Sequence, residues 1–241
     1  MGIRCAEAAH QPDLAFEVIL HVGTLISVLV YFHKSLCILV QSLYTKEMIE
    51  ERKKIMWLAV ATVPAVIVAL VFKDFFDSVP GNPTLVSAFL IVTGFVLFIP
   101  RIVKLGFSEV GLNSSIIMGF AQALAILPGI SRSGATIAAG MMSGVKADKA
   151  AEFSFLMSIP AIAGGFVLTM KNRMEETGSF SEALQSCFSA PYLAGAAAAA
   201  LVGLLAIYIV MGAVKKGKLE YFAYYCFAAG AAGVCYFALT S

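Results

Sequence analysis

Residues 119–144 read GFAQALAILPGISRSGATIAAGMMSG, and this stretch decides how the chain folds. It is apolar on both sides of a break at Pro128 and Gly129, and it carries Arg132 among several hydroxyl side chains. Proline and glycine interrupt helices, so the pattern predicts two half-helices that meet at the break. A guanidinium at hydrocarbon depth costs roughly 2.5–3.5 kcal/mol on insertion scales and is tolerated where it faces a wet cavity or a bound anion. We therefore expect Arg132 to face an anion.

The surroundings of Arg132 favour phosphate as that anion. The second half-helix would begin near Ser133, with free backbone N–H groups and the positive end of the helix dipole, and such ends bind anions. The guanidinium can hold two phosphate oxygens, and nearby hydroxyls can donate further hydrogen bonds. A Pro/Gly kink whose arginine extends to the lipid headgroups is the alternative, but it leaves the hydroxyl cluster unexplained. The candidate residues of this loop are Gly129, Ser131, Arg132, Ser133, Gly134 and Thr136.

The composition is that of an integral membrane protein. Sixty per cent of the residues are apolar and 13% are charged, with a mean hydropathy of +0.88, values that exclude a soluble domain. The net charge of +2 gives no reason to expect nucleic acid as a partner, and the five cysteines show no metal-ligand spacing. We expect an all-α polytopic protein of about six transmembrane helices plus one re-entrant helical hairpin. The predicted spans are residues 16–32, 55–72, 84–99, 153–170, 191–214 and 221–239, with the hairpin and its phosphate-binding loop at 115–145.

Charge placement decides how the hairpin region is threaded. If it returns to the side it entered, the loops 33–54, 101–113, 146–152 and 215–220 share one face and hold twelve Lys and Arg, against three in 73–83 and 171–190. A full crossing would reduce this bias to nine against six. The positive-inside rule therefore favours the hairpin and places the basic loops in the cytoplasm.

Three further ionisable residues lie in or beside the apolar runs. Glu17 and His21 share one face of the first helix with Thr24, and they could enter the same cavity and bind or protonate a phosphoryl group. The alternative places Glu17 at the membrane interface and gives His21 an interhelical hydrogen bond. Glu152 is expected to cap and charge the N-terminal turn of its helix, or else to approach the site from a neighbouring helix.

From about residue 16 onward, the chain resembles the bacterial undecaprenyl-diphosphate phosphatases linked to bacitracin resistance. The resemblance rests on LPGISRSGAT at 127–136, which is similar to the second signature of that family, and on residues 16–28, 151–160 and the basic loop before Tyr221. It implies hydrolysis of undecaprenyl diphosphate to undecaprenyl phosphate and inorganic phosphate, which recycles the lipid carrier of peptidoglycan synthesis. It also implies that Ser131, Arg132 and Thr136 bind or polarise the diphosphate, while Gly129, Ser133 and Gly134 shape the loop. A divalent cation, Mg²⁺ or Ca²⁺, is implied as cofactor, with unknown ligands.

One departure from the family concerns the N-terminus. The family carries a first re-entrant motif, EGxxEFLPxSSxGH, which supplies two glutamates and a histidine, and residues 1–10 (MGIRCAEAAH) do not fit it. We therefore treat residues 1–15 as a non-family stub before a single membrane domain at 16–241. A misassigned start and a real loss both stay open, and so do two alternative functions: a transporter or translocase of an anionic lipid, and a catalytically impaired member of the family. A homodimer is an alternative to a monomer.

Overall fold

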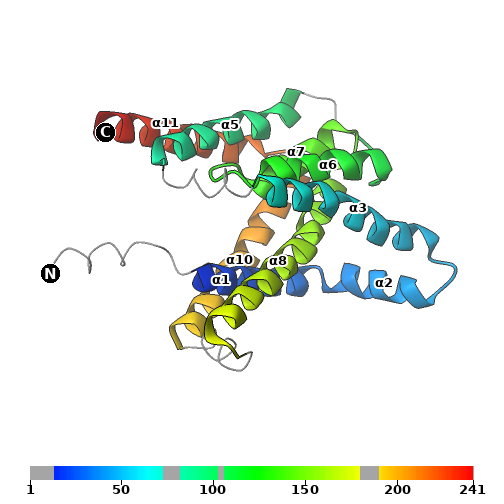
Figure 1. The fold of residues 1–241 in the computed structure, drawn as a ribbon. Helices are drawn as coiled ribbons and strands as arrows, with labels where there is room; N and C mark the ends of the chain where they lie inside the picture. The colour runs from blue at the N-terminus through cyan, green and yellow to red at the C-terminus, as the bar shows by residue number, and fades with distance from the viewer. Residues whose placement is uncertain (1–13, 73–81, 103–105, 180–189, 241) are drawn as a thin grey trace. The chain divides into compact units, whose positions relative to one another are not determined.

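The computed structural model of the chain describes residues 14–72, 82–102, 106–179 and 190–240, and nearly all of this part is helical (Figure 1). The helices are α1 (Leu14–Tyr31), α2 (His33–Tyr44), α3 (Ile49–Val71), α5 (Pro83–Ile102), α6 (Leu112–Leu124), α7 (Arg132–Met142), α8 (Ala147–Thr177), α10 (Ala190–Lys215) and α11 (Glu220–Thr240). Residues 1–10 lie outside the described residues, so the predicted stub stays a prediction.

The helices are those of a polytopic membrane protein, as the sequence predicts. In the described part of the chain, five helices are long and apolar enough to cross a bilayer, namely α3, α5, α8, α10 and α11. A sixth span results if α1 and α2, which a short break separates, are counted as one. The all-α prediction of about six spans is confirmed.

The prediction that residues 33–54 form a loop is wrong for most of this range. Most of it is helical, because α2 follows α1 directly and α3 already begins at Ile49. Arg52 explains the tight turn between α2 and α3. Its Nε and Nη2 donate to the carbonyl of Ser42 at 3.1 and 3.0 Å, and Nη2 also donates to the carbonyl of Thr45 at 2.9 Å. The guanidinium thus satisfies carbonyls that the end of α2 leaves without helical partners.

Contacts along the chain divide it into two compact units. The first unit comprises the described residues of Met1–Tyr31 and Ser158–Ile207. Here small residues bring α1 against α10, because a Cβ on Gly23 would come within 2.3 Å of the Ala196 carbonyl oxygen. The Ser27 hydroxyl donates to the Ala200 carbonyl at 2.7 Å across the same contact. Small residues and interhelical hydrogen bonds are the usual means by which membrane helices pack.

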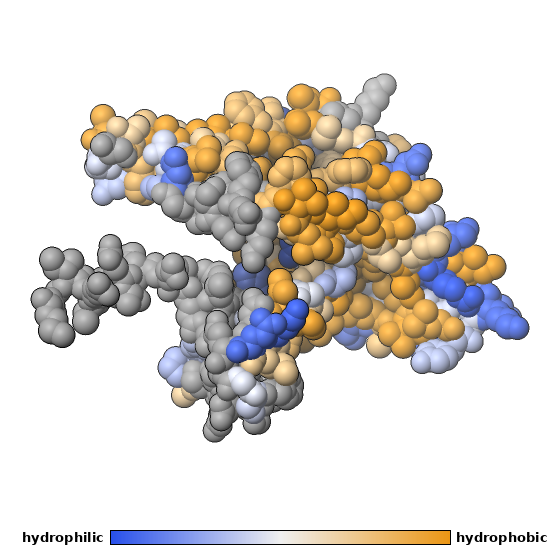
Figure 2. Space-filling model, in the orientation of Figure 1, coloured by the Kyte–Doolittle hydropathy of each residue, from blue (hydrophilic) through white to orange (hydrophobic). Residues whose placement is uncertain are grey.

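The second unit comprises the described residues of Phe32–Met157 and Tyr208–Ser241. Its helices pair as α5 with α11, α3 with α6 and α6 with α7. The α5–α11 pair joins through the rings of Phe95 and Phe227, whose centroids lie 4.9 Å apart. Exposed apolar side chains cover the outside of this pair, including Phe95 and Leu239 (Figure 2). Such a surface fits contact with lipid. Lipid offers no hydrogen-bond partners, but the backbone N–H and C=O groups of a helix already bond to each other.

Candidate anion site at the tip of a re-entrant hairpin

Helices α6 and α7 form a hairpin whose two ends lie side by side. Before α6, the Ser108 N–H donates to the Gly144 carbonyl at 3.2 Å, and the Lys146 N–H donates back to the Ser108 carbonyl at 3.0 Å. The Ser108 hydroxyl adds a bond to the Gly144 carbonyl at 2.6 Å. The hairpin therefore begins and ends at the same place, as the predicted re-entrant threading requires.

Both arms of the hairpin are too short to cross a bilayer. Helix α6 has 13 residues and α7 has 11, which correspond to lengths of roughly 20 and 16 Å at 1.5 Å per residue. The hydrocarbon core of a bilayer is about 30 Å thick. With the ends of the hairpin at a membrane surface, as predicted, the tip at residues 125–131 would lie at membrane depth, where irregular backbone is tolerated only when protein buries it or when it lines a cavity.

The tip is held against α5 by one hydroxyl. The fully buried Thr93 donates to the Gly129 carbonyl at 2.9 Å and accepts from the Ser131 N–H at 3.1 Å. Gly129 has a φ of +92°, a conformation that favours glycine. A Cβ at Gly129 would also come within 2.3 Å of the Val86 carbonyl oxygen on α5. The predicted break is thus a turn fixed by glycine and by a hydroxyl from another helix.

Ser131 begins α7 as its N-cap. Its hydroxyl oxygen accepts from the Gly134 N–H at 3.2 Å, and its carbonyl accepts from the Ala135 N–H at 2.8 Å. These bonds leave the N–H groups of Arg132 and Ser133 in the first turn available for an anion. The Ser131 hydroxyl keeps its own hydrogen for donation, because a hydroxyl that accepts a bond can still donate one. The helix starts one residue earlier than predicted.

Arg132 is the first helical residue of α7, and its guanidinium is incompletely satisfied. Its Nη1 atom is buried with no hydrogen-bond partner, and none of the ion pairs in the described part of the chain involves it. A buried, unpartnered donor costs about 1–3 kcal/mol, more when charged. A bound anion at the N-terminus of α7 would remove this cost. The unpartnered donor, the positive charge of the guanidinium and the positive end of the helix dipole all favour a negatively charged group there.

Thr136 lies deeper in the hairpin than the predicted role in substrate binding suggests. The residue is fully buried. Its hydroxyl donates to the carbonyls of Arg132 and Ser133 at 2.9 and 3.2 Å and also meets the Ser154 hydroxyl on α8 at 2.5 Å. These contacts occupy its single donor. They support a positioning role for Thr136, and its direct contact with a phosphate stays a prediction.

The remaining predicted residues divide between the two units. Ser133 is half-buried in the first turn of α7, and Gly134 is buried where a Cβ would lie 3.0 Å from Leu97 of α5. Glu17 and His21 lie on α1 in the first unit, and the side chain of Glu17 lies outside the described residues. The exposed His21 accepts the Thr24 hydroxyl at its carbonyl, at 2.8 Å. Their grouping with Arg132 therefore stays a prediction.

Two polar residues of this site escaped the sequence analysis. Thr93 is separated by more than 35 residues from the turn that it holds, so no local pattern connects the two. Gln122 lies within the stretch 119–144 and is 3% exposed, with both amide atoms buried and without a partner. The available signal for Gln122 is an uncharged amide within an apolar helix, which is weaker than the charge of Arg132.

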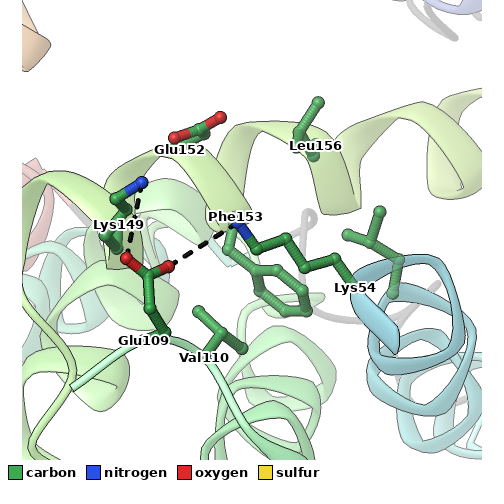
Figure 3. Close-up of a pocket in the computed structure, with 8 residues that line it drawn as sticks. Lys54, Glu109, Val110, Lys149, Glu152, Phe153 and Leu156 are labelled. Carbon is green, nitrogen blue, oxygen red and sulfur yellow. Dashed lines mark ion pairs between the residues drawn. The ribbon is translucent and has the colours of Figure 1, made fainter. Parts of the chain in front are cut away.

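Glu152 differs from the expected cap. Helix α8 begins at Ala147, so Glu152 lies in its second turn and the acidic residue of the first turn is Asp148. Glu152 instead lines a cavity of about 20 Å³ together with Lys54, Glu109 and Lys149 (Figure 3). Glu109 forms ion pairs with Lys54 at 3.6 Å and Lys149 at 3.5 Å. Three of the predicted cytoplasmic basic segments, 33–54, 101–113 and 146–152, thus meet beside the ends of the hairpin.

The described residues do not offer a metal site. Within this part of the chain, no three His, Cys, Asp or Glu side chains gather as ligands for an ion. Mg²⁺ and Ca²⁺ take oxygen ligands, chiefly carboxylates, and the hairpin tip provides hydroxyls and a guanidinium. The divalent cation therefore stays an expectation.

Comparison with known proteins now adds to this geometry. The chain matches the family described as Bacitracin resistance protein BacA over residues 2–232. It belongs to this family.

Several similar proteins are named undecaprenyl-diphosphatase. The protein of Syntrophotalea carbinolica is 40% identical over 96% of this chain and 86% of its own length. That of Methanobrevibacter smithii is 37% identical over 91% of this chain and 83% of its own length. That of Methanothermobacter thermautotrophicus is 45% identical over 71% of this chain and 93% of its own length.

Membership of the BacA family agrees with the structure of the hairpin. The family match includes the whole of α6, the tip and α7. The predicted resemblance to this family is therefore confirmed. The prediction of a multi-pass membrane protein is confirmed as well.

Proposed function

We propose that this chain hydrolyses undecaprenyl diphosphate to undecaprenyl phosphate and inorganic phosphate in the bacterial inner membrane. The reaction recycles the lipid carrier of peptidoglycan synthesis and thereby confers bacitracin resistance. The observation that carries the proposal is the unpartnered, buried Nη1 of Arg132 at the N-terminus of α7. The names of the relatives identify the substrate class that such an anion site would take.

The residues of the hairpin tip supply binding and charge stabilisation. Arg132 and the free N–H groups of the first turn of α7 hold the phosphate oxygens, and the Ser131 hydroxyl donates an additional bond. Donors that are fixed before the substrate arrives stabilise charge that develops on transferred phosphoryl groups. Thr93 and Thr136 keep these donors in place through their bonds to the backbone of Gly129, Ser131 and Arg132.

Acid/base chemistry needs groups beyond the hairpin tip. Phosphoryl transfer to water requires a base for the attacking water or a charge-neutralising group for the departing oxygen. Glu17 and His21 are our proposed candidates for these roles. A homodimer stays a further proposal.

A second function rests on the same observation. The tip contains donors for an anion, and the described side chains in direct contact with it include no general base. An anionic lipid could therefore be bound and translocated without being hydrolysed.

Release of inorganic phosphate from undecaprenyl diphosphate tests the proposal. The purified chain should release phosphate in detergent, and an equally well-folded Arg132→Ala variant should lose at least a hundredfold in rate, as expected when a principal charge-stabilising donor is removed. Lipid binding without phosphate release in the wild-type chain would favour the translocase. Equal rates for the two proteins would remove Arg132 from the site.

A further inference from the structure

The hairpin contains a second buried polar side chain that the proposed mechanism does not use. Gln122 lies on α6, two residues before the last residue of that helix. It is 3% exposed, and neither its Nε2 nor its Oε1 has a hydrogen-bond partner. Four buried side-chain atoms in the described part of the chain lack partners, and Gln122 and Arg132 account for three of them. Unsatisfied buried groups are rare and call for an explanation at each position.

The register of the hairpin places Gln122 near the start of α7. Met118 on α6 contacts the position that a Cβ on Gly140 of α7 would take, at 3.0 Å from its sulfur atom. Because the two arms are antiparallel, one turn toward the tip leads from Met118 to Gln122 and from Gly140 to Thr136. Gln122 therefore lies level with the first two turns of α7, which also carry Arg132.

Burial of an amide at this depth is costly without a partner. An unpaired amide in an apolar environment costs free energy, and a leucine or methionine of similar size would avoid this cost. The register places this amide level with the second turn of α7, in the same hairpin as the unpartnered Nη1 of Arg132, and unsatisfied polar atoms on both arms indicate a shared ligand. Positions at which a sequence accepts such a cost are commonly functional sites.

We propose that Gln122 is a phosphate-binding residue of the same site as Arg132. Its Nε2 group donates to an oxygen of the terminal phosphate of the diphosphate and of the inorganic phosphate product. Its Oε1 accepts from a P–OH group of the protonated phosphate. An amide is suited to this form of phosphate because it both donates and accepts. The proposal rests on the proposed function for the identity of the substrate, but phosphate binding itself does not require turnover.

The experiment compares three full-length proteins in detergent: the wild-type chain, Gln122→Met and the matched control Gln41→Met. Gln41 is an exposed glutamine on α2, outside the site. Binding of inorganic phosphate is measured by titration, and thermal unfolding is followed without ligand. Where the wild-type chain releases phosphate, KM and kcat for undecaprenyl diphosphate are measured as well.

We expect Gln122→Met to bind phosphate about tenfold more weakly and to raise KM by a similar factor, because one hydrogen bond to a charged ligand is lost. Its Tm without ligand should equal or exceed that of the wild-type chain, since an unsatisfied amide is removed. Gln41→Met should change neither property. A purely structural glutamine would give the opposite result, a lower Tm with unchanged phosphate binding, and this outcome would overturn the proposal. Phosphate binding that depends on Gln122 in a chain without turnover would retain the proposal and reject the phosphatase function.

Discussion

The backbone N–H of Ser131 donates to the hydroxyl of Thr93, 3.1 Å away on a different helix. The same hydroxyl donates to the carbonyl of Gly129, so one side chain of α5 holds both sides of residue 130. The geometry of the candidate anion site at the start of α7 thus depends on a side chain from another helix.

Replacing Thr93 with valine removes this connection and keeps the side-chain shape. The substitution leaves the Ser131 N–H and the Gly129 carbonyl buried and unpaired, which should lower the free energy of unfolding by about 1–3 kcal/mol. Displacement of the α7 start should lower the rate of phosphate release at least tenfold, because small misplacements of charge-stabilising donors are expensive. Thr93→Ser retains the hydroxyl and should recover most of the activity. Full activity in a folded Thr93→Val protein would show that the connection is dispensable.

Ser131 has two separable roles, one in the helix and one in the site. Ser131→Ala removes the N-cap, at a cost of about 1 kcal/mol, together with the free hydroxyl donor. Ser131→Asp restores the cap but adds a negative charge beside the phosphate. We expect Ser131→Asp to unfold near the wild-type Tm and yet to lose more activity than Ser131→Ala. If activity instead followed Tm in both variants, the role of Ser131 would be structural alone.

Thr136 and Ser154 should behave as one unit. Thr136→Val removes the bonds to the carbonyls of Arg132 and Ser133 and leaves the Ser154 hydroxyl buried without its partner. Destabilisation of about 1–3 kcal/mol is expected from such a loss. Ser154→Ala should lower stability less, and the double variant should cost less than the sum of the two single changes. Chemical denaturation of the four proteins provides the measurement. Strict additivity, with a kcat effect confined to Thr136→Val, would instead indicate direct contact with the substrate.

Gly129 can be compared with a second glycine of similar backbone conformation. Gly129 and Gly217 have φ values of +92° and +66°, but a Cβ would meet the Val86 carbonyl only at Gly129, since Gly217 faces open space. Gly217→Ala should therefore cost about 1 kcal/mol through backbone strain. Gly129→Ala should be far more damaging, with loss of folded protein or of activity, as assayed by size-exclusion profile and phosphate release. Equal behaviour of the two variants would contradict the close approach of the tip to α5.

The threading of the hairpin can be tested in intact membranes. In a cysteine-free background, Phe107→Cys and Lys146→Cys place thiols at the two exposed ends of the hairpin. A membrane-impermeant thiol reagent should label both positions from the same side, and the positive-inside rule predicts the cytoplasmic side. Labelling from opposite sides would reject the re-entrant threading.

The sequence predicts those parts of this structure that depend on neighbouring residues. Long apolar runs are sufficient to predict the spanning helices, and Pro128 and Gly129 are sufficient to predict the broken helix, while the anion site at Arg132 stays a prediction. Helix α2 was missed because its basic residues and its position in a charged segment resembled a loop. The prediction that Glu152 caps its helix is wrong because α8 begins at Ala147, before the apolar run at 153–170.

Contacts between distant segments could not be predicted in this way. The bonds of Thr93 to the tip and of Thr136 to Ser154 join residues 18 to 38 positions apart. Serine and threonine are common in membrane helices, where they often bond to their own backbone. Only the packing of α5, α7 and α8 shows which hydroxyls hold the site and which could reach a ligand.

The pairing of Ser108 with Gly144 also affects how the chain enters its membrane. If the joined ends lie at one membrane surface, as predicted, the arginine at the tip enters the apolar layer and never has to emerge on the far side. Assembly of the protein would then avoid moving a guanidinium through the full hydrocarbon thickness, one of the least favourable steps in membrane insertion.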